Sequence, residues 1–249
     1  MKLVSIIIPY FKKKDSIRHA VNSILKQTYQ NFELIIVYDD KDHSDIPLIE
    51  DIKKLDERIL ILINKTNIGA GMSRNRGISQ AKGFYLAFLD ADDVWDYRKL
   101  EIQINFMETN DFPATHTSYD IIDSKNNFIS KRVAKKLNYN DLLKSCDIGL
   151  STVILRKDLL NNNLKFPEIK TKEDYVLWLM IAKNGYLFQP LTDSLTKWKI
   201  SKNSLSSSLF QKLIDGYIVY HKYMKFSFIK SILLLLQLCF FYLCKKLKF

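Results

Sequence analysis

Short apolar runs alternate with amphipathic segments over the first 90 residues of the chain. Continuous apolar runs rich in β-branched residues are typical of strands buried on both faces of a parallel sheet. Four such runs are expected to form strands, at residues 4–8, 32–38, 58–63 and 84–89. Helical spacing predicts three helices between them, one capped by Asp15 and reaching Leu25, one near 45–55, and one entered through a loop within 69–81. This order predicts a parallel sheet with right-handed crossover helices.

After Trp95 the alternation becomes less regular. Helical spacing predicts helices near residues 98–108 and 172–183. Three strand candidates lie between them, at 114–119, 128–133 and 152–155. We therefore expect the second half of the chain to extend the same sheet with mixed, partly antiparallel strands.

The C-terminal segment, residues 226–247, contains a stretch, 232–244, that is apolar all round. This stretch is shorter than the ~20 residues that a helix needs to cross a bilayer. Lysines flank it and can extend their charges to lipid headgroups; they are Lys230, Lys245, Lys246 and Lys248. Two structures fit the pattern: a helix at or partly inserted into a membrane surface, and a helix packed in a core or a dimer interface.

The positive charge of the chain is concentrated near its C-terminus. The formal net charge is +11, and residues 197–249, with ten lysines and one acid, Asp215, carry +9 of it. Basic residues beside an apolar segment indicate an anionic membrane surface, whereas nucleic-acid-binding proteins spread them over a docking face with interleaved aromatic residues. We therefore expect a membrane partner and no nucleic acid.

Cysteines and histidines do not form a pattern typical of metal ligands. The three cysteines, Cys146, Cys239 and Cys244, and the four histidines lack ligand spacing, so zinc is not expected. So few cysteines without a pattern indicate a reducing compartment, and the first apolar run begins without a cleavable signal. These features predict a cytoplasmic protein, or one on the inner face of the cell membrane.

Three carboxylates, Asp90, Asp92 and Asp93, interrupt the apolar segment LAFLDADDVW at residues 86–95. Strands disfavour Asp and neighbouring like charges repel, so a neutralising partner is expected. A hard divalent cation that carries a phosphate meets this need, and open α/β sheets bind ligands at the carboxyl ends of their strands. The pattern predicts a nucleotide-diphosphate site; a solvated acidic turn is the alternative.

Several segments in a fixed order resemble the family 2 glycosyltransferases, which have a GT-A fold. The motifs, beside the acidic turn, are VSIIIPYF (4–11), SILKQTY (23–29), FELIIV (32–37), NIG (67–69), SRNRGI (73–78), AKG (81–83) and KEDYVLWL (172–179). The resemblance covers about residues 3–205. It implies an α/β fold with a Rossmann-like, mixed but mostly parallel sheet flanked by helices, and a hydrophobic, basic helical tail follows. Residues 1–110 would form the nucleotide-sugar-binding half of one domain, 111–208 its acceptor-binding half, and 209–249 the membrane-associating tail.

The resemblance also implies an activity. The chain would be a metal-dependent inverting glycosyltransferase, a hexosyl- or N-acetylhexosaminyltransferase, with Mn²⁺ or Mg²⁺ as cofactor. It would move a sugar from a nucleotide donor, a UDP-sugar, to a hydroxyl of a glycan or lipid-linked glycan in bacterial surface-polysaccharide synthesis. A nucleotide-sugar-binding scaffold at the membrane that lacks turnover is the alternative.

By the resemblance, the donor nucleotide contacts Pro9, Tyr10 and Phe11. Asp39 would accept the imide N–H of a uracil, and a helix-capping role is the alternative. Arg74 would bind the diphosphate with its guanidinium fork, unless it forms a structural ion pair with one of the aspartates.

The acidic turn would supply the remaining donor contacts. Asp90 would face the ribose, and Asp92 would hold the metal ion that bridges the two phosphates, with Asp93 as a rival metal ligand. The metal ion would neutralise the charge that develops on the departing nucleoside diphosphate.

Asp174 would be the general base that deprotonates the acceptor hydroxyl, and the helix dipole would keep its pKa low. Without the resemblance, Glu173 and Asp174 form an ordinary acidic first turn of a helix. Glu173 and Trp178 are candidates for acceptor contacts, with core packing as the alternative for Trp178. Ser201 stands where many family members carry a His, and Lys199 or Lys202 would substitute for it electrostatically.

Overall fold

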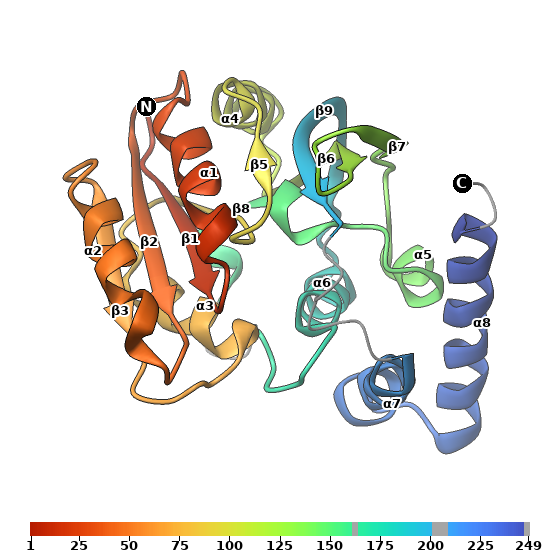
Figure 1. The fold of residues 1–249 in the computed structure, drawn as a ribbon. Helices are drawn as coiled ribbons and strands as arrows, with labels where there is room; N and C mark the ends of the chain where they lie inside the picture. Colours follow the sequence, from red (N-terminus) through yellow and green to blue (C-terminus); the bar gives the residue numbers. More distant parts are fainter. Residues whose placement is uncertain (161–163, 201–208, 247–249) are drawn as a thin grey trace.

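The computed structural model describes residues 1–160, 164–200 and 209–246 and contains one nine-stranded sheet flanked by helices (Figure 1). The strand order is β3-β2-β1-β4-β8-β6-β9-β5, and β7 pairs with β6. The strands are β1 (Val4–Tyr10), β2 (Phe32–Tyr38), β3 (Ile59–Ile63), β4 (Tyr85–Phe88), β5 (Val94–Trp95), β6 (Ala114–Ile122), β7 (Phe128–Arg132), β8 (Ile154–Arg156) and β9 (Gln189–Lys199).

Helices cover both faces of the sheet (Figure 1). The α-helices are α1 (Lys14–Leu25), α2 (Ile46–Lys53), α3 (Ala70–Gln80), α4 (Lys99–Asn110), α5 (Tyr139–Lys144), α6 (Glu173–Lys183), α7 (Leu209–Ile218) and α8 (Phe228–Lys246). Shorter turns are η1 (His43–Asp45), η2 (Leu150–Thr152), η3 (Lys157–Leu159) and the π-helical η4 (Val219–Tyr223).

Strands β1 to β4 are mutually parallel, which confirms the parallel half expected from the sequence. Ile6, Ile7 and Ile8 are all fully buried although consecutive side chains of a strand point to opposite faces. Both faces of β1 are therefore covered, which is why its apolar run shows no alternation. One detail is different: α1 begins at Lys14, so Asp15 lies in its first turn and does not cap the helix.

The second half extends the sheet with mixed strands, as expected. β8 is antiparallel to β4, and β6 is antiparallel to β8, so the halves predicted for 1–110 and 111–208 share one sheet. β9 pairs in parallel with β6 and antiparallel with β5. Neither β5 nor β9 was expected. Only Leu195 and Thr196 of β9 are buried, so this strand shows no apolar period.

The two faces of the sheet carry separate apolar cores. Ile6 and Ile8 face the core formed with α1, α2 and α4, whereas Ile7 faces the core formed with α5 and α6. Helix α3 approaches this second face closely, because a Cβ at Gly77 would lie 2.7 Å from Cγ2 of Ile7. Crossover helices run antiparallel to their strands, so the start of α3 lies at the carboxyl ends of β1 and β2.

The C-terminal helices pack beside α5 and α6 (Figure 1). The hydroxyl groups of Tyr220, in η4, and Tyr175, in α6, lie 2.9 Å apart in a hydrogen bond. Leu238 of α8 belongs to the same core as these residues. Helix α5 was not expected from the sequence, whereas α7 lies within the tail, residues 209–249, that was expected to be helical. In the part of the chain that the structure describes, no helix is both long enough and apolar enough to cross a membrane.

Candidate active site

The acidic turn follows β4 at the carboxyl edge of the parallel strands. The backbone N–H of Asp93 donates to the carbonyl of Asp90 at 3.0 Å, which closes the turn. The backbone N–H of Asp90 donates to Oγ of Ser151, in η2, at 3.1 Å. The turn is therefore tied to the second half of the sheet and presents its carboxylates at the edge where such folds bind ligands.

Arg74, on α3, lies beneath the turn and is almost completely buried. Its guanidinium donates to Oδ1 of Asp90 at 2.7 Å and to Oε1 of Glu173 at 2.6 Å. Burial alone would lower the pKa of Arg74, but Asp90 and Glu173 raise it above its ordinary value. These contacts correspond to the structural ion pair that was the alternative for Arg74, and they join the acidic turn to the start of α6.

Asp92 forms an ion pair with Lys13, the residue before α1. Nζ of Lys13 lies 2.6 Å from Oδ2 of Asp92. The side chains are 28% and 22% exposed, so the pair lies at the surface of the site and is accessible to a ligand. Lys13 therefore places a positive charge where a diphosphate bound by Asp92 and its cation would lie.

Asp93 is buried and uses both carboxylate oxygens within the protein. Oγ of Ser151 donates to Oδ2 at 2.5 Å, and the backbone N–H of Lys199, at the end of β9, donates to Oδ1 at 3.2 Å. Burial raises the pKa of Asp93 well above its usual range, and the neighbouring Asp90 and Asp92 add to this effect. These contacts make Asp93 a link between the turn, η2 and β9.

Asp39 follows β2 and binds the loop that leads into α3. Oδ1 accepts hydrogen bonds from Nδ2 of Asn64 and the backbone N–H of Ile68, and Oδ2 accepts one from the backbone N–H of Gly69, each at 2.8 Å. Gly69 immediately precedes α3, so Asp39 satisfies a donor at the amino end of that helix. This geometry matches the capping alternative and leaves Oδ2 with further acceptor capacity.

The end of β1 supplies the other expected nucleotide contacts. Tyr10 is fully buried, stacks on Tyr38 with ring centroids 5.3 Å apart, and donates its hydroxyl to Oδ2 of Asp45 at 2.6 Å. Pro9 and Phe11, on either side, are half-buried. The structure therefore leaves Pro9 and Phe11 accessible, while the side chain of Tyr10 belongs to the interior.

Asp174 is half-buried in the first turn of α6, beside Glu173. Burial raises the pKa of Asp174 to about 7, with the charge of Glu173 adding to the shift and Arg74 opposing it. The expectation that the helix dipole keeps this pKa low is therefore wrong, because burial outweighs the dipole. A carboxylate with a pKa near 7 is well suited to accept a proton at neutral pH.

Trp178, one turn further along α6, is completely buried. Its ring lies against Phe88, Phe166 and Phe188, with centroid distances of 6.4, 6.3 and 5.1 Å. This burial fits the packing alternative for Trp178 and leaves no surface for an acceptor.

A cavity of about 310 Å³ lies between the acidic turn and the start of α6. Asp90 and Asp174 line it from two different elements. The rest of its wall is Asp93, Tyr119, Cys146, Ile148, Gly149, Leu150, Ser151, Thr152, Thr196 and Trp198. The cavity is therefore bounded on one side by the acidic turn and on the other by residues of the second half of the chain.

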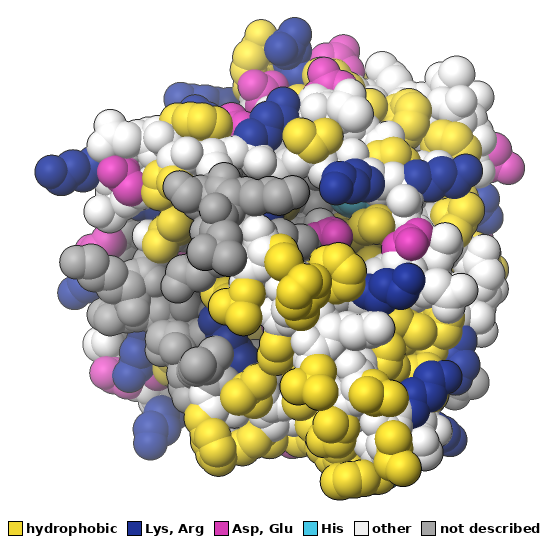
Figure 2. All heavy atoms as spheres, turned by 90° about the vertical axis from the view of Figure 1, so that its right-hand side faces the viewer, with side chains coloured by type: hydrophobic (Ala, Val, Ile, Leu, Met, Phe, Trp, Pro, Cys, Tyr) yellow, Lys and Arg dark blue, Asp and Glu magenta, His cyan; other side chains and the backbone are white. Residues whose placement is uncertain are grey.

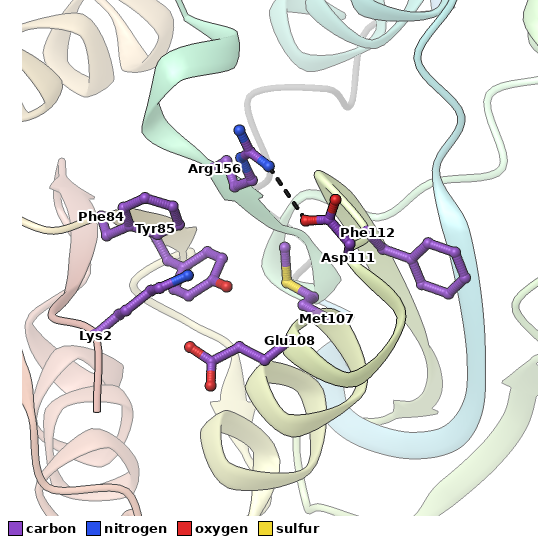
Figure 3. A pocket seen from close by; sticks show the side chains of 8 residues that line it. All are labelled: Lys2, Phe84, Tyr85, Met107, Glu108, Asp111, Phe112 and Arg156. Atoms are coloured by element: carbon purple, nitrogen blue, oxygen red, sulfur yellow. Dashed lines mark hydrogen bonds and ion pairs between the residues drawn. The ribbon is translucent and has the colours of Figure 1, made fainter.

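A second cavity, of about 220 Å³, lies near the amino end of β4 (Figure 3). Asp90, by contrast, follows the carboxyl end of that strand. Lys2 and Arg156 face it with several aromatic rings. Nζ of Lys2 lies 4.1 Å from the Phe84 ring centroid, and Arg156 pairs with Asp111 at 3.5 Å. None of the predicted site residues lines this cavity, so the candidate active site is the cavity beside Asp90.

The carboxylate oxygens of the acidic turn suit a hard divalent cation. In the described parts of the chain, no three or more His, Cys, Asp or Glu side chains are arranged to hold a metal ion. Mg²⁺ and similar ions are commonly held by one or two carboxylates together with substrate phosphates, so a complete protein cage is not required. Asp90 and Asp92 are accessible carboxylates on one turn and fit such a cation, whereas both oxygens of Asp93 are already engaged.

Sequence reasoning missed Lys13 and Ser151. The sequence does contain a signal for Lys13, because a run of three lysines, residues 12–14, lies shortly after the first strand, at the edge where ligands bind. Ser151 carries none, since it reaches the turn only through the antiparallel pairing of β8 with β4. Ser201, the replacement for the usual His, lies outside the described residues, as does Lys202.

Comparison with known proteins identifies the family. The model of Glycosyl transferase family 2 matches residues 5–164. The Escherichia coli protein "UDP-Glc:alpha-D-GlcNAc-diphosphoundecaprenol beta-1,3-glucosyltransferase WfgD" is 40% identical over 213 residues, 85% of this chain and 82% of that protein. The Bacillus subtilis "Putative teichuronic acid biosynthesis glycosyltransferase TuaG" is 31% identical over 231 residues, 92% of this chain and 91% of that protein. The chain therefore belongs to glycosyl transferase family 2, as its motifs predicted, and is a glycosyltransferase.

The fold agrees with this assignment. The mannosyltransferase PcManGT from Pyrobaculum calidifontis, solved in complex with GDP-Man and Mn²⁺, superposes with a TM-score of 0.68 at 15% identity over 90% of this chain and 64% of that one. The expected GT-A fold is thereby confirmed.

Proposed function

We propose that the chain is a metal-dependent inverting glycosyltransferase that moves a sugar from a UDP-sugar to a hydroxyl of a lipid-linked glycan in surface-polysaccharide synthesis. The observation that carries the proposal is the single cavity lined by both Asp90 and Asp174. A donor bound at the acidic turn would present its anomeric carbon to this cavity, and an acceptor hydroxyl beside Asp174 would attack from the opposite face.

The donor side would be assembled from the carboxyl ends of β1, β2 and β4. Asp92, with Asp90, would hold the divalent cation. This cation would neutralise the negative charge of the departing diphosphate. Lys13 would contribute a second positive charge to the same diphosphate. Asp39 fixes the loop that leads into α3, and a direct contact with uracil would use the remaining acceptor capacity of its Oδ2.

On the acceptor side, Asp174 would take the proton of the attacking hydroxyl. A positioned general base contributes roughly 10²–10⁴-fold to such transfers. Arg74 would orient Asp90 and Glu173 and would not bind the diphosphate, since its side chain is buried and each terminal nitrogen already donates to one of these carboxylates. Glu173 would then support Asp174 and the start of α6, with its acceptor contact secondary.

The names of the relatives support the donor and acceptor classes. WfgD is named for UDP-Glc and for a GlcNAc-diphosphoundecaprenol acceptor. By analogy, we propose a UDP-sugar donor and an acceptor held in the membrane by a polyprenyl diphosphate. Such an acceptor would place the enzyme at the cytoplasmic face of the membrane.

The test is UDP release from UDP-Glc and UDP-GlcNAc, with a GlcNAc-diphospholipid acceptor, in the presence of Mn²⁺, Mg²⁺ or EDTA. We expect turnover that needs both acceptor and cation. Binding of UDP without turnover under every condition would instead identify a scaffold protein that binds nucleotide sugars.

A further inference from the structure

Helix α8 exposes an apolar stripe along its whole length. The stripe residues follow one another at intervals of four and three, the spacing of one helix face. They are Ile229, Leu233, Leu236, Phe240 and Leu243, each between 56% and 72% exposed. A helix that is apolar all round is normally buried, so an exposed stripe of this kind indicates a missing apolar partner.

The opposite face of α8 is held firmly by the protein. Ser231 is fully buried, and Leu238 is 7% exposed in the core shared with α5 and α6. Leu235 packs on α7 so closely that a Cβ at Gly216 would lie 2.7 Å from its Cδ1. The helix is therefore fixed lengthwise against the domain, and its exposed stripe can contact an apolar phase only from the side.

The surface around the stripe is basic. Figure 2 shows hydrophobic side chains gathered on this side of the molecule, with Lys and Arg side chains at their margin. Lys222, Lys225 and Lys230 are exposed next to the start of α8. Asp215, the single acid in residues 209–246, is buried, where it accepts hydrogen bonds from Thr171 and Gln211. This unit therefore presents apolar groups and positive charge without an exposed carboxylate.

The stripe is connected to the acceptor side of the active site by a short path. Helix α5 packs on α8, and the segment after α5 continues into Cys146, Ile148 and Gly149, which line the cavity. Helix α5 therefore links the helix that carries the stripe to one wall of the cavity.

We propose that the outer face of α8 docks on an anionic lipid surface, with the stripe in the interfacial region and the lysines on the headgroups. The proposal rests on the proposed function for its purpose, because a lipid-linked acceptor would then be held beside the cavity. A second copy of the chain is a poorer partner, since pairing two such faces would bring their lysines together.

The test uses the full-length protein and vesicle flotation, with vesicles of phosphatidylcholine alone or mixed with phosphatidylglycerol. We expect binding to the anionic vesicles that weakens with salt. The double variant Leu233→Glu with Leu236→Glu should lose about tenfold or more of this binding, because two charges would enter the interface. The matched control is Leu55→Glu with Leu60→Glu. These two leucines are 44% and 38% exposed, and Leu60 lies in β3.

Three outcomes would overturn the proposal: no binding of the unmodified protein, equal binding of the stripe variant, or a dimer that the stripe variant converts to monomers. UDP release with a water-soluble acceptor analogue, together with thermal melting, shows whether the variant remains folded. Vesicle binding without turnover would leave the docking surface standing and reject the proposed function. Turnover without vesicle binding would reject the docking surface and leave the proposed function standing.

Discussion

Nη1 of Arg74 lies 2.6 Å from Oε1 of Glu173, so a guanidinium on α3 is bonded to the first residue of α6, 99 positions away in the chain. The same guanidinium holds Asp90. One buried cation therefore fixes the position of Asp90 relative to the helix that carries Asp174, the proposed general base, and the distance between these two parts of the candidate site depends on it.

Replacement of Arg74 should disable the enzyme through this link. Arg74→Met leaves Asp90 and Glu173 without their partner, and removing one side of a buried ion pair costs about 3–5 kcal/mol. Arg74→Lys should restore only part of this loss, because an ammonium lacks the planar fork that serves both carboxylates. Chemical denaturation measures the loss of stability, and UDP release measures the loss of activity.

A surface arginine provides the control. Arg98 is 53% exposed and lies 3.8 Å from Asp96. Arg98→Met should change stability by no more than about 1 kcal/mol. An Arg74→Met protein as stable and active as this control would show that the buried bridge has no structural role.

Asp92 and Asp93 should respond differently to substitution. Asp92→Asn removes a carboxylate from the proposed cation site while its partner Lys13 remains partly solvated, so turnover should disappear with little change in melting temperature. Asp93→Ala leaves the Ser151 hydroxyl and the Lys199 N–H without their acceptor, at a cost of about 1–3 kcal/mol. Thermal melting and Mn²⁺ titration separate the two effects. Full activity of Asp92→Asn would remove Asp92 from the metal site.

Activity should follow the ionisation of Asp174. The base works only when deprotonated, so with a pKa of about 7 the rate should fall as the pH is lowered through neutrality. Asp174→Asn should be slower by roughly 10²–10⁴-fold and should lose this pH dependence. Measurement of kcat/KM from about pH 5 to about pH 9, a range that spans this pKa, tests both points.

Asp174→Asn should lower the activity but raise the stability of the folded protein above about pH 7, the raised pKa of Asp174. A carboxyl whose folded pKa is raised favours folding below its unfolded pKa, and this contribution is lost as the pH rises through the folded value. Asp174→Asn should therefore be more stable than the unmodified protein at pH 8, and the advantage should shrink toward pH 4. Equal stability at both pH values would show that Asp174 is not desolvated in the folded protein.

Lys13 should compete with a divalent cation for Asp92, because the two residues form an ion pair. Lys13→Gln should tighten Mn²⁺ binding in the absence of nucleotide by up to about fivefold, the equivalent of a partly exposed ion pair of about 1 kcal/mol. It should also raise the KM for the donor, because the diphosphate loses a positive neighbour. Calorimetric Mn²⁺ titration reads the first effect without catalysis.

The neighbouring Lys12 is the matched control for this substitution. Lys12 is exposed, with its ammonium 5.3 Å from the Phe11 ring centroid. Lys12→Gln should leave Mn²⁺ affinity unchanged. A Lys13→Gln protein that binds Mn²⁺ no more tightly than Lys12→Gln would contradict the competition.

Strands β1, β2 and β4 could be predicted because each is covered on both faces, so burial appears directly as a run of apolar residues. The edge strand β3 is also a run of apolar residues, although Leu60 and Ile63 are exposed. The eleven residues of β9 could not be predicted, since all but Leu195 and Thr196 are half-buried or exposed, and the strand is held by backbone pairing with β6 and β5. Long-range pairing of β9 with β6 nevertheless positions Lys199 against Asp93.

The candidate site, too, could be predicted from the sequence only in part. A carboxylate cluster after a buried strand is a local pattern, so Asp90, Asp92 and Asp93 could be located from the sequence. Their separate roles could not be assigned, because Asp92 faces Lys13 at the surface whereas Asp93 faces Ser151 in the interior. The pKa of Asp174 likewise follows from burial, which the helix position alone did not reveal.

The sequence by itself determined the family, the parallel half of the sheet, and the edge at which the carboxylates gather, because these depend on residue patterns over a few consecutive positions. Only the tertiary structure decided which carboxylate is bridged, buried or accessible, and which face of α8 stays uncovered. Those properties depend on desolvation and on charges brought within a few ångströms by segments far apart in the chain, and no local pattern records such distances.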